Sequence, residues 1–149
     1  MSGKKNGQVS TTAFIMALMI PLIFFLVSCS AKIDESKTMV RNGRLYNIGS
    51  DKPFTGFVTG ISRGEDYRKG KFLFKKEYKD GLLDGRSFYY YPDKTIESIE
   101  PYINGVLNGV VTRYYDNGQL KARLHFVDGY RGGGKGEMFW NKDGSRRDG

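Results

Sequence analysis

The chain has 149 residues, with 24 Lys and Arg against 16 Asp and Glu, and its formal charge is +8. This length leaves room for one domain at most once any leader is removed, and the absence of blocks of roughly five or six like charges argues against a nucleic-acid-binding face. The single cysteine excludes a disulfide framework within the chain and a cysteine-based metal site.

The first predicted element is an export leader over residues 1–28. Lys4 and Lys5 precede a run from Ala13 to Val27 that is apolar throughout except for Pro21. Fifteen residues of helix span about 22 Å, less than the roughly 30 Å hydrocarbon core, so the run is short for a membrane span. A basic segment followed by a short apolar segment is typical of a secretory signal. An uncleaved anchor and a core helix are the alternatives.

The leader ends in Leu26-Val27-Ser28-Cys29, which resembles the bacterial lipobox, where a branched apolar and a small residue precede a cysteine. The resemblance implies cleavage between Ser28 and Cys29, with a diacylglyceryl group on the Cys29 thiol. Acyl chains at about 0.8 kcal/mol per buried CH₂ hold a protein on a membrane. In diderm bacteria, Ser30 after the cysteine favours the outer membrane. Residues 29–38 are polar and mixed in charge, which predicts a flexible tether behind the lipidated cysteine.

Residues 39–149 form the predicted folded domain, and they repeat with a period of 24 residues. The segments 78–81, 102–105 and 126–129 each begin with an aromatic residue and end in Asp-Gly or Asn-Gly. The glycines that mark the predicted turns are Gly81, Gly85, Gly105, Gly109, Gly118, Gly129, Gly133 and Gly144. A fixed period of this length indicates an array of one supersecondary unit.

Each unit contains two predicted turns. The Asx-Gly pairs adopt positive φ at low cost and favour two-residue hairpin loops. The second turn of each unit falls at 92–94, 117–118 and 143–144. Asn117-Gly118 predicts a type I′ loop, and Lys94, which stands in the place of Gly118, predicts a turn of another type.

The predicted fold is all-β, an elongated antiparallel meander of hairpin repeats. Apolar and polar residues alternate with a period of two over 72–78 and 120–126, and no helix is predicted after residue 30. Eight or so strands of six or seven residues would make a sheet about 20 Å wide and roughly 40 Å long. One face would be apolar and the other charged. A small β-sandwich is the alternative, because an apolar face needs cover.

These repeats resemble the MORN-repeat variant of bacterial proteins, whose unit is roughly Tyr-x-x-Gly-x-x-x-Gly, a strand, a Tyr-x-x-Gly turn and a second strand. The best-matching unit carries Tyr102, Gly105, Gly109, Tyr115, Gly118 and Leu120 in order. The likeness covers about residues 46–147 and includes an opening half-unit at 52–56. It implies a repeat protein built of hairpins. Proteins of this family are often labelled antitoxins of toxin–antitoxin systems, which implies a toxin as partner.

The sequence offers little that resembles catalytic machinery. The sole histidine, His125, shares its predicted polar face with Lys121 and Arg123. Residues 129–135 match the first seven positions of a phosphate loop, but Gly136 replaces the Ser or Thr, and no helix is predicted to follow. We therefore expect no enzymatic activity, no cofactor and no metal.

The apolar face admits two interpretations. Its side chains either stack across the strands to stabilise a thin sheet, or stay exposed as a binding surface for a peptide, a glycan or another envelope protein. The residues of this face are Phe72, Phe74, Tyr78, Tyr102, Leu120, Leu124 and Phe126. The first functional hypothesis is a non-enzymatic, lipid-anchored binding or structural module of the cell envelope with an unknown protein partner. The alternative is an antitoxin- or immunity-type inhibitor of a toxin.

Overall fold

The computed structural model describes residues 31–63, 71–132 and 136–147 of the chain. The predicted leader with Ser28, the predicted lipidation residue Cys29 and the repeat glycine Gly133 lie outside these residues. Within the described ranges, no helix has the length and apolar character needed to cross a membrane.

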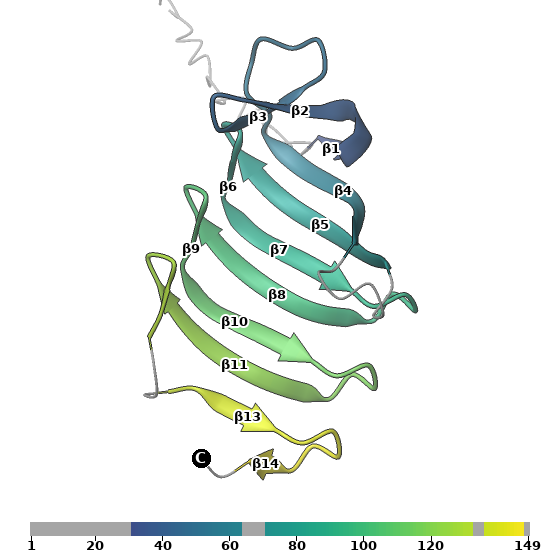
Figure 1. Ribbon diagram of the computed structural model, residues 1–149, viewed down its shortest axis with the longest axis vertical. Helices are drawn as coiled ribbons and strands as arrows, with labels where there is room; N and C mark the ends of the chain where they lie inside the picture. The colour runs from purple at the N-terminus through teal and green to yellow at the C-terminus, as the bar shows by residue number, and fades with distance from the viewer. Residues whose placement is uncertain (1–30, 64–70, 133–135, 148–149) are drawn as a thin grey trace, which may run out of the picture.

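One long sheet makes up most of the fold (Figure 1). Its strands succeed one another in space in the order β1-β4-β5-β7-β8-β10-β11-β13-β14. Their bounds are Lys32–Asp34, Gly56–Arg63, Lys71–Lys79, Gly85–Tyr90, Ile96–Ile103, Gly109–Tyr114, Leu120–Val127, Met138–Trp140 and Arg146–Arg147. Every neighbouring pair is antiparallel except β1 with β4. The predicted meander is confirmed, and the sandwich alternative is not what the chain forms.

Short strands extend the main hairpins at one side of the sheet, the left in Figure 1. They are β6 (Leu82–Leu83), β9 (Val106–Leu107) and β12 (Tyr130–Arg131). Each of these strands pairs back onto the strand before it, β5, β8 or β11. A separate hairpin of β2 (Thr38–Arg41) and β3 (Arg44–Asn47) precedes the meander.

The start of the folded domain corrects one prediction. Lys32–Asp34 forms β1, Glu35–Lys37 a single 3-10 turn labelled η1, and Thr38 already belongs to β2. The backbone N–H of Phe57 donates to the carbonyl of Ala31 at 2.7 Å, and Ile33 packs against the core. The prediction of a flexible tether is therefore wrong from Lys32 onward. Among the described residues the edge of β4 is otherwise unpaired, and the segment from Lys32 to Asp34 forms a strand along it.

The core lies on one face of the sheet, which we call the inner face. Cross-strand neighbours share a face, and the ladder places Phe74 opposite Gly60 and Val111 opposite Leu124. One cluster joins Phe74 to Leu45, Phe54 and Val58, and a second joins Val111, Ala122 and Leu124. Because Leu45 comes from β3, the β2–β3 hairpin covers the N-terminal end of the inner face.

Candidate functional site

The first turn of each repeat is the predicted two-residue hairpin loop. Residues 80–81, 104–105 and 128–129 have φ of 49° at the Asx position and 78° to 86° at the glycine, as a type I′ turn requires. The glycine amides of these tight turns donate to backbone carbonyls of the preceding unit, at 2.8 Å for Gly81 to Phe54, 2.7 Å for Gly105 to Leu83 and 2.9 Å for Gly129 to Leu107. The tight turns thus bind each repeat to the one before it.

A second set of glycines stands where the chain leaves the short hairpin and rejoins the sheet. These return glycines are Gly56, Gly85 and Gly109, with φ of 143°, 108° and 115°. A Cβ on Gly56 would lie 2.2 Å from the carbonyl oxygen of Ala31, and one on Gly109 would lie 3.0 Å from Cγ of Pro101. The position therefore needs glycine both for its positive φ and for its close packing. Gly56 ends the predicted opening half-unit at 52–56, so this half-unit follows the same repeat pattern.

The second turn of each repeat differs from its prediction. In the turn at 115–119, the amide of Gly118 donates to Tyr115 at 2.9 Å and that of Tyr115 donates to Gln119 at 2.8 Å. Gly118 has φ of 80°, whereas Asn117 is not among the described residues with positive φ. This wide turn is a three-residue loop whose last residue is left-handed, so the predicted type I′ loop is wrong.

Lys94 occupies the same wide turn one repeat earlier. Its φ is 73°, its amide donates to Tyr91 at 2.9 Å, and the amide of Tyr91 donates to Thr95 at 2.9 Å. The prediction that Lys94 marks a turn of another type is also wrong. The shared element is the Asx residue before the left-handed position: Asp93 accepts from the amide of Thr95 at 2.9 Å, as Asn117 does from that of Gln119 at 3.2 Å.

The predicted binding face is the inner face, and much of it is core. Phe74 is 3% exposed and Leu124 is 7% exposed. Tyr78, Tyr102 and Phe126 are partly buried on the same face, while Phe72 lies in β5 and Leu120 in β11. The β2–β3 hairpin covers Phe74, and Leu107 of β9 packs on the Leu124 cluster. At these positions the burial favours the first of the two interpretations, in which the side chains stack across the strands.

Hydroxyl groups gather at the centre of the inner face. Ser87 and Ser98 are 1% and 2% exposed, and Tyr102 donates to Oε2 of Glu100 at 2.9 Å. Burial and then the charge of Glu100 raise the pKa of Tyr89 to about 12, and the same causes raise the pKa of Tyr102. Both phenols therefore stay protonated near neutral pH. Ser87 Oγ has no hydrogen-bond partner among the described residues, so no base activates it as a nucleophile.

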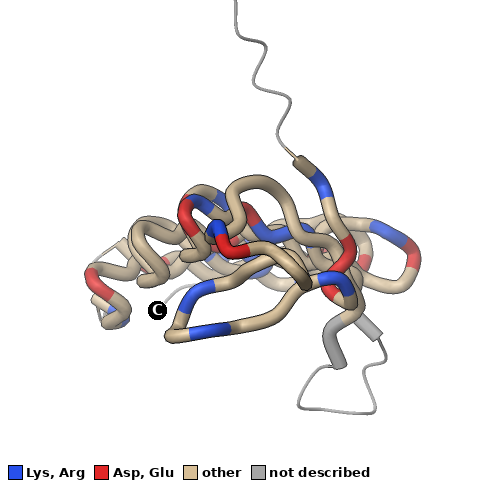
Figure 2. The backbone as a smooth tube through the Cα atoms, turned by 90° about the horizontal axis from the view of Figure 1, so that it is seen from above, with Lys and Arg blue, Asp and Glu red and all other residues tan. Residues whose placement is uncertain are grey.

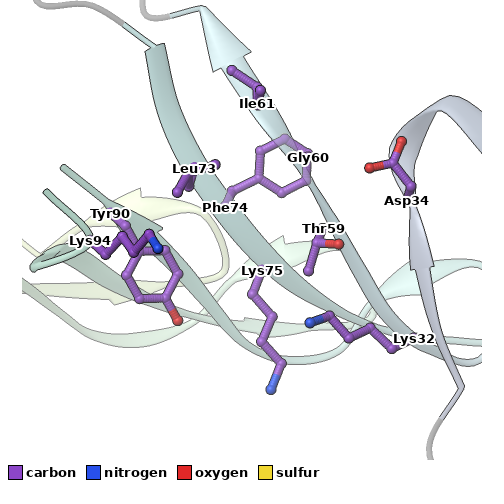
Figure 3. Close-up of a pocket in the computed structure, with 10 residues that line it drawn as sticks. All are labelled: Lys32, Asp34, Thr59, Gly60, Ile61, Leu73, Phe74, Lys75, Tyr90 and Lys94. Atoms are coloured by element: carbon purple, nitrogen blue, oxygen red, sulfur yellow. The ribbon is translucent and has the colours of Figure 1, made fainter. Parts of the chain in front are cut away.

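The opposite, outer face carries a groove that the sequence did not predict (Figure 3). It has a volume of about 470 Å³ and lies over β1, β4, β5 and the wide turn at 91–95. Its lining residues are Lys32, Asp34, Thr59, Gly60, Ile61, Leu73, Phe74, Lys75, Tyr90 and Lys94. The alternation in β5 indicated that Leu73 and Lys75 share the face opposite Phe74, but not that Tyr90 from β7 joins them.

The groove combines an apolar floor with cationic margins. Ile61 is 53% exposed, and Leu73 and Tyr90 beside it are partly exposed. None of Lys32, Lys75 and Lys94 forms an ion pair with a carboxylate in the described part of the chain. The acidic lining residue, Asp34, accepts from the hydroxyl of Ser36 at 2.6 Å and from its amide at 2.9 Å, which lowers the pKa of Asp34.

The outer face of β11 is charged, as predicted. Lys121, Arg123 and His125 are exposed and alternate with the buried Ala122 and Leu124. Along the described part of the chain, basic and acidic positions are interspersed rather than gathered at one side (Figure 2). The ranges that the structure describes hold no group of three His, Cys, Asp or Glu residues that could bind a metal ion.

Comparison with known proteins finds one family. Residues 83–104 and 107–128 each match the MORN repeat variant. The two matches are offset by 24 residues, the period of the tight turns, and they begin beside the return glycines Gly85 and Gly109. No curated protein matches the chain, and no solved structure does. The repeat match indicates a binding or structural module.

Proposed function

We propose that the protein is an exported, lipid-anchored binding module of the cell envelope, held on the membrane through Cys29 and without catalytic activity of its own. The observation that carries the proposal is Leu26-Val27-Ser28-Cys29 at the end of a leader of two lysines and an apolar run. The match of two repeats to the MORN repeat variant supports the binding part.

The position of the first strand supports a membrane-proximal arrangement. The carbonyl of Ala31 is already bonded to β4, so only Ser30 separates the sheet from Cys29. Two residue steps reach about 7 Å at most, which would hold the β1 edge at the lipid headgroups. The remaining strands, at about 4.8 Å each, would carry β14 up to about 38 Å from that edge. The domain would thus present its faces at a fixed distance from the membrane.

The chemistry of the described residues supports a non-catalytic role. The buried Tyr89 and Tyr102 hold their protons well above neutral pH, and Ser87 has no base to activate it. His125 is exposed on the charged outer face of β11, and within the described ranges no hydrogen bond joins its ring to a nucleophile.

Metabolic labelling with an alkyne fatty acid tests the anchor. We expect the wild-type protein to carry the label and the Cys29→Ser variant to carry none, because the thiol is the site of lipid transfer. Ser30→Ala is the matched control, since it changes the neighbouring residue but keeps the thiol, and it should label like the wild type. Equal labelling of Cys29→Ser would overturn the lipoprotein assignment.

A further inference from the structure

We propose that the outer-face groove binds an acidic, extended peptide segment of another envelope protein, with carboxylates on the lysines and an apolar side chain on the floor beside them. The inference rests on the proposed role as a binding module and assigns its binding surface. Much of the predicted apolar face is buried in the core, whereas the groove exposes apolar side chains beside lysines that form no ion pair in the described part of the chain.

Charge complementarity defines the ligand. Lys32, Lys75 and Lys94 come from three different elements, β1, β5 and the wide turn at 91–95, and all three line the groove. Figure 3 shows Lys32 extending from β1 toward Lys75, with Lys94 beside Tyr90 at the other side. The one carboxylate of the lining, Asp34, is engaged by Ser36. The groove therefore offers a net positive rim to carboxylates, which would steer an acidic partner.

The floor requires more than a charge. Ile61, Leu73 and Tyr90 present apolar surface in the same groove as the lysines, and Ile61 is 53% exposed. A small anion would satisfy the ammonium groups and leave this surface in water. A peptide that alternates acidic and apolar side chains would cover both, in the manner of strand-like ligands that place alternate side chains in a groove.

The same features favour a peptide over a phospholipid. A phospholipid carries its charge at one end, whereas the lysines of the groove come from three separate elements, β1, β5 and the wide turn at 91–95. Contact with the floor would also require an acyl chain to leave the bilayer, which costs about 0.8 kcal/mol for each CH₂ exposed. An extended peptide reaches these separate lysines without that cost.

The groove is built on rigid elements. Lys75 lies in the nine-residue strand β5, and its Nζ stands 3.9 Å from the ring centroid of Phe57 on β4. Lys94 is held by the hydrogen bonds of its wide turn. Preformed positions of this kind reduce the entropy lost when a ligand binds.

Fluorescence anisotropy with the full-length lipidated protein in neutral detergent tests the proposal. The probe is a rhodamine-labelled peptide, Glu-Val-Glu-Phe-Glu-Val, compared with a Lys-for-Glu version and with a version in which Ser replaces Val and Phe. The test variant combines Lys75→Gln with Lys94→Asn, because asparagine tolerates the left-handed turn position while removing the charge. The matched control, Lys121→Gln with Arg123→Gln, removes the same charge from the same face of the sheet.

We expect the acidic apolar peptide to bind best, and its affinity to fall at least about tenfold in the test variant and less than about twofold in the control. Equal losses in both variants, no binding by the wild type, or equal binding of the three peptides would overturn the proposal. Displacement by monomeric dihexanoyl phosphatidylglycerol at lower concentration than by unlabelled peptide would assign the groove to lipid instead and also overturn it. Fatty-acid labelling of the same preparations separates the two proposals, because a labelled protein that binds no peptide contradicts only the groove.

Discussion

Lys94 and Gly118 occupy the same position of the same wide turn, one repeat apart, so exchanging their residue types should move the stability in opposite directions. Both residues are left-handed, with φ of 73° and 80°. Lys94→Gly places the favoured residue where a side chain is now strained, and Gly118→Lys does the reverse. We expect the first variant to be more stable than the wild type and the second to be less stable.

The magnitude follows from the backbone alone. A Cβ on Gly118 would meet nothing within 4 Å, so no steric clash adds to the cost of the left-handed conformation. That conformation costs an L-residue roughly 1–2 kcal/mol. Glycine also gives the unfolded chain more conformational entropy, which lowers the stability of the folded protein by roughly 0.5–1 kcal/mol and offsets part of this difference. The net change should be about 0.5–1 kcal/mol in each direction.

Urea unfolding of a soluble chain that begins at Ala31 measures both shifts. Gly81→Ala serves as the positive control, because its Cβ would stand 2.9 Å from the carbonyl oxygen and 3.0 Å from the nitrogen of Leu45, and backbone cannot move aside cheaply. Its midpoint should fall further than that of Gly118→Lys. Midpoints that shift in the same direction for Lys94→Gly and Gly118→Lys would refute the shared turn.

Two further predictions concern the hydroxyls of the inner face. Ser87→Ala should raise the urea midpoint, because it removes a buried Oγ that has no hydrogen-bond partner among the described residues, and burying such a group costs roughly 1 kcal/mol of stability. A lowered midpoint would show that the hydroxyl does make a stabilising hydrogen bond. Stability should also fall between pH 10 and pH 12, since the unfolded chain releases the Tyr89 proton near 10 while burial holds the folded pKa at about 12. Tyr89→Phe should flatten that fall in urea midpoints, and an unchanged slope would contradict the assignment to Tyr89.

Short-range chemistry made the repeat frame predictable from the sequence. The tight turns at 80–81, 104–105 and 128–129 need positive φ at two consecutive positions, and Asp-Gly and Asn-Gly meet that need wherever they occur. The alternation of residues 120–126 likewise fixed which side chains of β11 face the core, because a strand has a period of two. Both features depend on neighbouring residues only.

The wide turns and the groove could not be predicted because they depend on pairing between strands. Asn117-Gly118 fits a two-residue or a three-residue loop, and the choice is made by the register of β10 and β11, which shifts between Arg113 and Tyr114. The groove needs β1 and β7 on either side of β4 and β5, and β1 has three residues, too few for a periodic pattern. Sequence reasoning therefore assigned β1 to the tether.

The hydrogen bonds between repeats explain why the chain before the first complete repeat is folded. Each unit is stabilised by its neighbours: Tyr91 donates through its hydroxyl to the carbonyl of Tyr114 at 2.8 Å, and Tyr115 donates in the same way to Trp140 at 2.8 Å. In such an array an end unit lacks one neighbour and needs a cap. The amide of Leu45 donates to Gly81 at 2.9 Å, so the β2–β3 hairpin takes the place of a preceding repeat. β1 pairs with β4 at the edge of the sheet, so residues 32–37 of the predicted tether belong to the folded domain. The domain therefore starts almost directly after the residue proposed to carry the lipid.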